Sequence, residues 1–249
     1  MTRFTTIVVV LAMATQIPST ALAAGAMSTT HQQAVQFAKG KNSAQVRGSI
    51  KGDGDATYTV NARAGQTLAV SLTSKNASLN FNINAPGSKE SMFIGSVQGA
   101  KASVVLPTDG SYVVQVYLMR NAARRSESAS YTLEVSVTGQ PLPPLSAAQD
   151  ALVPGTRFHA TATVPCQTLG AEAGASCKAN VTRRGRDGTA TVEMRSASGL
   201  SRNVLFAKSQ PVASDSAQPM TSSRQGDVTT VRFGTDERYD VPDALLTGG

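Results

Sequence analysis

Tryptophan is absent from this sequence of 249 residues, and aromatic residues make up 5% of it. Histidine and cysteine occur only twice each, which argues against a histidine-based zinc site and excludes a disulfide-dense scaffold. Charged residues make up 16% and hydrophobic residues 41%, and that apolar share is close to that of ordinary globular chains. Ala, Ser, Thr, Val and Gly are abundant instead, which favours small β-rich domains over a helical bundle.

Motifs that carry catalysis are also missing. The chain contains no GxSxG, HExxH or GxxxxGK[ST] pattern. His31 falls in a polar stretch before the first predicted strand, and His159 is expected on the solvated face of a strand, so neither is placed to serve a nucleophile. Asp53 and Asp55 resemble the start of a calcium loop, but the later ligands are missing and a tight turn is predicted. We therefore expect no enzyme activity, no metal and no cofactor.

The first 24 residues have the composition of a secretory signal peptide. Arg3 gives a positive start, residues 7–14 are apolar, and Ala21-Leu22-Ala23 supplies a small-x-small cleavage site. No later segment approaches 18 consecutive apolar residues, so no membrane span is predicted. We expect residues 1–24 to be removed and the mature protein to be secreted across the inner membrane into the periplasm.

Positive charge is concentrated in the first half of the chain. Residues 24–139 contain eleven Lys and Arg against six Asp and Glu, whereas residues 140–249 contain eleven against ten. This excess fits either an anionic partner or a solubilising surface. Nucleic acid is not expected as the partner, because the basic residues are not interleaved with stacking aromatics and export is predicted.

Residues 25–40 are polar and predict a flexible leader, and residues 41–139 alternate between apolar and polar positions with the period of β-strands. Gly and Asp clusters such as Gly52-Asp53-Gly54-Asp55 and Asp109-Gly110 separate the strands as turns. The pattern predicts an antiparallel sandwich or barrel-like domain. Its inward faces are expected to be Tyr58/Val60/Ala62, Leu68/Val70/Leu72, Leu79/Phe81/Ile83, Tyr112/Val114/Val116/Leu118 and Tyr131/Leu133/Val135/Val137.

A linker over residues 140–150, rich in proline near its start, separates this domain from a second β-rich unit over residues 151–249. The sequence as a whole thus predicts an all-β protein with two small antiparallel sandwich or barrel-like domains. Cys166 and Cys177 both lie in the second unit, and in an exported protein they predict a disulfide, worth roughly 3 kcal/mol. Residues 210–226 are polar and are expected to form a loop.

The most distinctive segment joins two predicted strands and is rich in arginine. Here Arg120, Arg124 and Arg125 cluster in one expected hairpin loop together with Tyr117 and Asn121. Arginine and tyrosine are enriched in the energetic centres of protein interfaces. A solvated basic turn is the alternative interpretation.

At these positions the sequence resembles the periplasmic lysozyme inhibitors of bacteria, in particular those that act on invertebrate-type and goose-type lysozymes. The resemblance runs from about residue 43 to 137 and lies in the order and spacing of several short motifs. These are Ser43-Ala44-Gln45, Gly48-x-Ile50-Lys51-Gly52, Asp55-x-x-Tyr58, Ala62-x-Ala64-Gly65-Gln66, Ala85-Pro86-Gly87, Gly110-x-Tyr112 and Arg120-Asn121-x-Ala123-Arg124.

This resemblance implies a β-domain that occludes a lysozyme cleft with loops. Family inhibitors insert a Ser-Gly-x-Tyr loop, and the matching positions here are Asp109, Gly110, Ser111 and Tyr112, with Asp109 in place of Ser. An acidic cleft would repel that carboxylate. Either Asp109 bonds a nearby backbone N–H, which is the favoured interpretation, or Ser111 takes over its role, or inhibition is lost. Tyr112 either contacts the enzyme or packs in the core.

Taken together, the resemblance and the interface composition of these loops predict nine residues that contact a lysozyme. They are Asp109, Gly110, Ser111, Tyr112, Tyr117, Arg120, Asn121, Arg124 and Arg125. Two other hypotheses stay open. The chain could be a periplasmic module that binds carbohydrate or peptidoglycan without inhibiting anything, although it has few aromatic residues for a sugar platform, or a structural envelope protein with passive domains.

Overall fold

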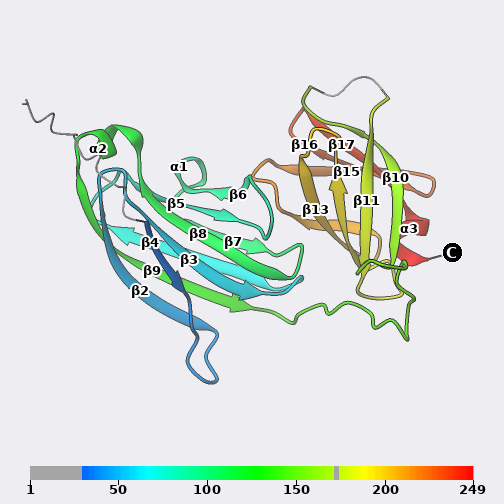
Figure 1. The fold of residues 1–249 in the computed structure, drawn as a ribbon, viewed down its shortest axis with the longest axis horizontal. Coiled ribbons are helices and arrows are strands. Elements are labelled where there is room, and N and C mark those ends of the chain that lie inside the picture. The colour runs from blue at the N-terminus through cyan, green and yellow to red at the C-terminus, as the bar shows by residue number, and fades with distance from the viewer. Residues whose placement is uncertain (1–29, 171–173, 249) are drawn as a thin grey trace, which may run out of the picture.

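The computed structural model describes residues 30–170 and 174–248, so the expected signal peptide lies outside the described residues. Two β-domains follow one another along the chain, joined by an extended linker (Figure 1). The predicted all-β fold class is confirmed. Among the described residues, no helix has the length and apolar character needed to cross a membrane.

The first domain packs two sheets face to face. The five-stranded sheet has the order β1 (Thr30–Ala34), β3 (Asp55–Ala62), β8 (Gly110–Leu118), β5 (Leu79–Asn84), β6 (Ser91–Ile94). The four-stranded sheet has the order β2 (Ser43–Lys51), β9 (Ser128–Thr138), β4 (Thr67–Ser74), β7 (Lys101–Val105). Two short helices, α1 (Gly95–Gln98) and α2 (Arg120–Arg124), connect strands.

The core of this domain consists of the side chains that the alternation placed on the inward faces. Tyr112, Val114 and Val116 of β8 are fully buried, and they face the buried set of β9 and β4 across the sandwich. The Tyr58 and Tyr131 hydroxyls, one from each sheet, are hydrogen-bonded to each other at 2.7 Å. Burying apolar area on both sheets is what holds the two layers together.

Residues 30–34, which fall within the expected leader, form β1 and pair in parallel with β3. His31 lies opposite Ala56, and its ring stands 6.4 Å from that of Tyr58. This strand has no apolar alternation because it lies at the edge of the sheet and contributes mainly backbone hydrogen bonds. For that reason the sequence pattern did not predict it.

The second domain is one eight-stranded sheet that coils on itself, so that β11–β13 share a single core with β16 and β17. Its order is β14 (Gln210–Ser214), β13 (Ser201–Ala207), β12 (Ala190–Arg195), β11 (Ser176–Arg183), β10 (Ala160–Gln167), β17 (Glu237–Pro242), β16 (Val228–Phe233), β15 (Met220–Gln225). Helix α3 (Asp243–Thr247) follows. The predicted Cys166–Cys177 disulfide is confirmed and ties β10 to β11.

Two expectations for this domain are wrong. Residues 210–226 are not a loop but contain β14 and β15, the two outer strands of the sheet, whose exposure explains their polar composition. His159 is not solvated but 6% exposed. Its Nδ1 accepts a hydrogen bond from the Arg183 backbone N–H, and its Nε2 donates to the Leu145 carbonyl, because the linker folds back over this side of the sheet.

The two domains meet through charged and apolar contacts. Arg184 of the β11–β12 turn donates to Asp109 at 3.0 Å, and Arg202 of β13 donates to Glu90 at 2.9 Å. A small apolar cluster joins Ala64 of the first domain to Leu205 and Ala213 of the second. Both arginine side chains are almost fully buried, so the second domain is docked on one end of the first and not merely tethered to it.

Candidate functional site

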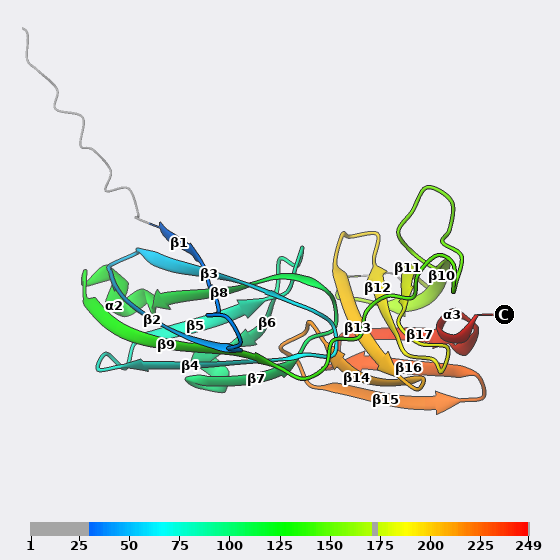
Figure 2. The same cartoon turned by 90° about the horizontal axis from the view of Figure 1, so that it is seen from below.

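The nine candidate residues fall into two groups at opposite ends of β8. Asp109, Gly110, Ser111 and Tyr112 lie at its start, next to the second domain, whereas Tyr117 and the arginine segment lie at its end. Nine residues of strand span roughly 26 Å. The structure therefore does not bring the two groups together, and Figure 2 shows α2 at the far end of the first domain from the second.

At the start of β8, the Asp109 carboxylate is fully engaged within the molecule. Its Oδ1 accepts a hydrogen bond from the Ala64 backbone N–H at 2.9 Å, which is the kind of bond favoured for it from the sequence. Its Oδ2 accepts from Arg184 at 3.0 Å. Arg184 also bonds the Leu142 carbonyl and the Thr191 hydroxyl, and Thr191 donates to the Pro107 carbonyl at 2.6 Å. The second domain therefore contacts this turn, although the Asp109 side chain stays about one third exposed.

Tyr112 is fully buried, and its hydroxyl donates to the Thr108 carbonyl at 2.7 Å. Burial raises the pKa of this phenol above its ordinary range. The side chain belongs to the inward set of β8 and holds the turn in shape, so of the two roles considered for it the structure shows core packing. Ser111 next to it is exposed and donates to the Asn61 side chain.

Gly110 has a backbone φ of +139°, a region that residues with a Cβ rarely adopt. A Cβ placed there would lie 2.8 Å from the ring of Pro86. Glycine is therefore required both by the backbone angle and by the close approach of the Ala85-Pro86-Gly87 turn. Its role in the structure is to form the turn that the second domain contacts.

At the other end of β8, the arginine segment is a short helix and not the expected hairpin loop, because β8 and β9 lie in different sheets. Ala122 and Ala123 are buried in the core and anchor α2, while Arg120, Asn121 and Arg124 point outward. Within the part of the chain that the structure describes, the side chains of Arg120 and Arg124 have no hydrogen-bond or ion-pair partner. Two free cations are thus held on one rigid turn.

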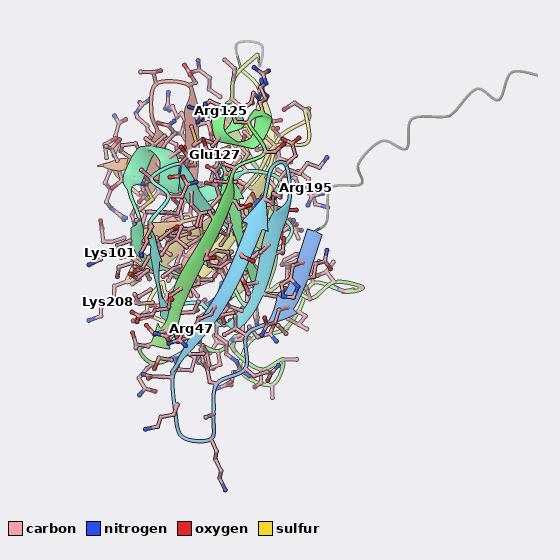
Figure 3. The ribbon with its side chains drawn as sticks, turned by 90° about the vertical axis from the view of Figure 1, so that its left-hand side faces the viewer. Arg47, Lys101, Arg125, Glu127, Arg195 and Lys208 are labelled. Atoms are coloured by element: carbon pink, nitrogen blue, oxygen red, sulfur yellow. A yellow bond between two sulfur atoms is a disulfide. The ribbon has the colours of Figure 1, made fainter. Side chains whose placement is uncertain are left out.

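Two of the candidate residues at this end are held by neighbours. Arg125 pairs with Glu127 at 2.5 Å, and Figure 3, which looks onto this end, shows the two side chains beside α2. Glu127 also accepts a hydrogen bond from Asn76, and this bond, followed by the pair with Arg125, lowers the pKa of the carboxyl. The Tyr117 hydroxyl donates to Asn82 at 3.2 Å.

An open groove of about 960 Å³ runs beside α2 and includes residues that the sequence did not single out. Arg47 of β2 and Lys75 and Asn76 of the β4–β5 turn line it together with Arg125 and Glu127. They come together because β9 pairs with β2 on one side and β4 on the other. Long-range strand pairing of this kind leaves no local sequence pattern. The result is a largely basic surface, which we call the α2 end.

No family model matches the sequence. An inhibitor of g-type lysozyme from Escherichia coli K12 is 32% identical over 106 residues, which are 41% of this chain and 78% of that protein. The chain belongs to the family of g-type lysozyme inhibitors.

Two solved structures of g-type lysozyme inhibitors are also similar to this chain. Aeromonas hydrophila PliG is 38% identical, with a TM-score of 0.42, over 44% of this chain and 97% of that protein. Salmonella Typhimurium PliG is 30% identical, with a TM-score of 0.37, over 44% of this chain and all of that protein. Both are described as periplasmic lysozyme inhibitors. Each of these alignments covers less than half of this chain.

Proposed function

We propose that this protein inhibits a g-type lysozyme in the periplasm, and that it is an inhibitor and not an enzyme. Family membership supports the activity. The observation that carries the choice of surface is the contrast along β8. The Asp109 turn is bonded to the second domain, whereas the side chains of Arg120 and Arg124 are exposed and unpaired at the α2 end.

The chemistry of the α2 end suits a lysozyme cleft. A guanidinium can form two parallel hydrogen bonds to a carboxylate, and lysozyme clefts carry acidic catalytic residues. Because α2 is anchored by buried alanines, its two free arginines lose little backbone freedom on binding. Asn121 extends from the same helix and Tyr117 from the adjoining strand, so both can contribute to the contact.

The substitution of Asp109 for the family serine has a simple explanation under this proposal. The carboxylate is neutralised by Arg184 and is used to dock the second domain. It therefore does not have to enter a cleft of like charge. Tyr112 and Gly110 shape the same docking turn, and Ser111 remains an exposed neighbour of it.

The proposal is tested by hydrolysis of bacterial cell walls by a goose-type lysozyme, with and without the mature protein. We expect inhibition, and we expect Arg120→Ala/Arg124→Ala to weaken it by roughly a hundredfold or more, since each lost charged hydrogen bond costs about 1.5–3 kcal/mol. The matched control is Lys101→Ala/Arg232→Ala, which also removes two exposed cations but leaves the α2 end intact. Equal weakening in both variants would refute a specific role for α2.

A further inference from the structure

A polar cleft of about 510 Å³ lies between the two domains. Its floor is the outer face of β11–β13, and its opposite wall is formed by the Pro86-Gly87 and Thr108-Asp109 turns. Phe158, two residues before β10, closes one side. The size is within the range of small-molecule sites.

The floor of the cleft carries a row of polar side chains from three neighbouring strands. Asn180 lies directly opposite Glu193, and Glu193 lies opposite Asn203, on three neighbouring strands. Residues in register point to the same face of a sheet. Thr182 continues the face, two residues beyond Asn180.

The side chain of Asn180 has no internal partner although Asn180 is only 8% exposed. Among the residues the structure describes, neither its amide nor the Thr182 hydroxyl makes a side-chain hydrogen bond. Asn203 in the same row differs, because it donates to Asp215 at 2.7 Å. Since no buried side-chain nitrogen or oxygen among the described residues lacks a partner, the Asn180 amide must reach the solvent of the cleft, where it is free to bond a ligand.

The charges of the lining are balanced. Arg184 is paired with Asp109 at 3.0 Å, and Arg157 lies 3.7 Å from Glu193 while its guanidinium lies over one face of the Phe158 ring. The lining therefore offers no unpaired cation to attract an anionic ligand. Amide, hydroxyl and carboxylate groups beside one aromatic ring match the hydroxyls and the apolar face of a sugar. A peptide strand would instead favour a free sheet edge.

We propose that the cleft between the domains binds a neutral sugar unit of a glycan, with Asn180 and Thr182 as hydrogen-bonding groups and Phe158 as the stacking surface. This goes beyond lysozyme inhibition, which we assign to the α2 end. The second domain would thereby add a glycan site to the inhibitor domain. Loss of one activity would leave the other measurable.

The test is a calorimetric titration of the full mature protein with two neutral probes, chitotetraose and maltotetraose. We expect saturable binding of at least one. Asn180→Ala should weaken it roughly fivefold to tenfold without lowering the unfolding midpoint, because no internal hydrogen bond is lost. Thr182→Val and Phe158→Ala should also weaken it. Thr161→Ala, opposite Asn180 on β10 but exposed and outside the cleft, is the control and should bind normally.

Three results would overturn the proposal. The first is no saturable heat with either sugar at millimolar concentration. The second is wild-type affinity in Asn180→Ala, or a lowered unfolding midpoint of that variant, which would show that the amide is structural. The third is saturation by tetra-alanine but by neither sugar, which would assign the cleft to peptides.

Discussion

Both ends of β8 carry polar or charged candidate binding residues, but the two ends differ in whether those residues already have partners within the molecule. At its start, Asp109 is bonded to Arg184 from the second domain, and Tyr112 is buried. At its end, Arg120 and Arg124 are exposed and unpaired. From the family resemblance alone, both ends of β8 are expected to contact a lysozyme. The difference shows that the second domain bonds to one end of β8 and leaves the other end free of such contacts.

Two arginines of the second domain, Arg184 and Arg202, bond to the first domain. Of the two, we expect Arg202 to contribute more to the free energy of unfolding. Its side chain is 1% exposed and bonds Glu237 and Glu90, with Asp215, which is fully buried, close by. Arg202→Ala leaves a buried carboxylate without its cation and should lower the free energy of unfolding by about 3–5 kcal/mol. Chemical denaturation measures this.

The control for that variant is Arg195→Ala on the neighbouring strand, whose side chain is 59% exposed. Its effect should stay within about 0.5 kcal/mol, as for other surface substitutions. If the two variants were equally stable, the network around Arg202 would contribute nothing to docking, and the comparison between the two ends would lose its physical basis.

Arg184→Ala should have an intermediate effect on stability and none on inhibition. Removing its hydrogen bond to Asp109, which is about one third exposed, should cost roughly 2 kcal/mol. A double-mutant cycle with Asp109→Asn isolates the pair, and we expect a coupling of about 1 kcal/mol. Cell-wall assays should show unchanged inhibition of a goose-type lysozyme. A clear loss of inhibition would mean that the Asp109 turn takes part in binding.

The smallest effect concerns pH at the α2 end. The pKa of Glu127 is lowered from its ordinary value of 4.5 by the Asn76 bond and Arg125. Because the folded pKa lies below the unfolded one, the stabilisation is present above pH 4.5 and is lost as pH falls through the lowered pKa. Glu127→Gln should flatten this slope slightly in acid denaturation. If the dependence of stability on pH did not change, the bonds of Glu127 to Asn76 and Arg125 would not contribute to stability.

Local patterns predicted a large part of this molecule. The period-2 sets of β8 and β9 identified the core residues, and the cysteine pair predicted the disulfide. Strand β1 was missed because its contribution is in the backbone. The outer strands β14 and β15 were missed because their exposure makes them polar.

The candidate site was less accessible to sequence reasoning. Alternation tells which face a residue occupies but not what lies at the end of the strand. Asp109 and Arg184 are 75 residues apart, so no local signal links them. The same holds for Lys75 and Asn76, which join Arg125 only through the pairing of β4 with β9.

The central claim is that lysozyme contacts the α2 end and not the turn beside the second domain. Hydrogen exchange of the mature protein, free and bound to a goose-type lysozyme, tests this most directly. We expect new protection in residues 117–128 and 73–78 and unchanged exchange in residues 107–112. Protection of residues 107–112 without protection at α2 would contradict the account.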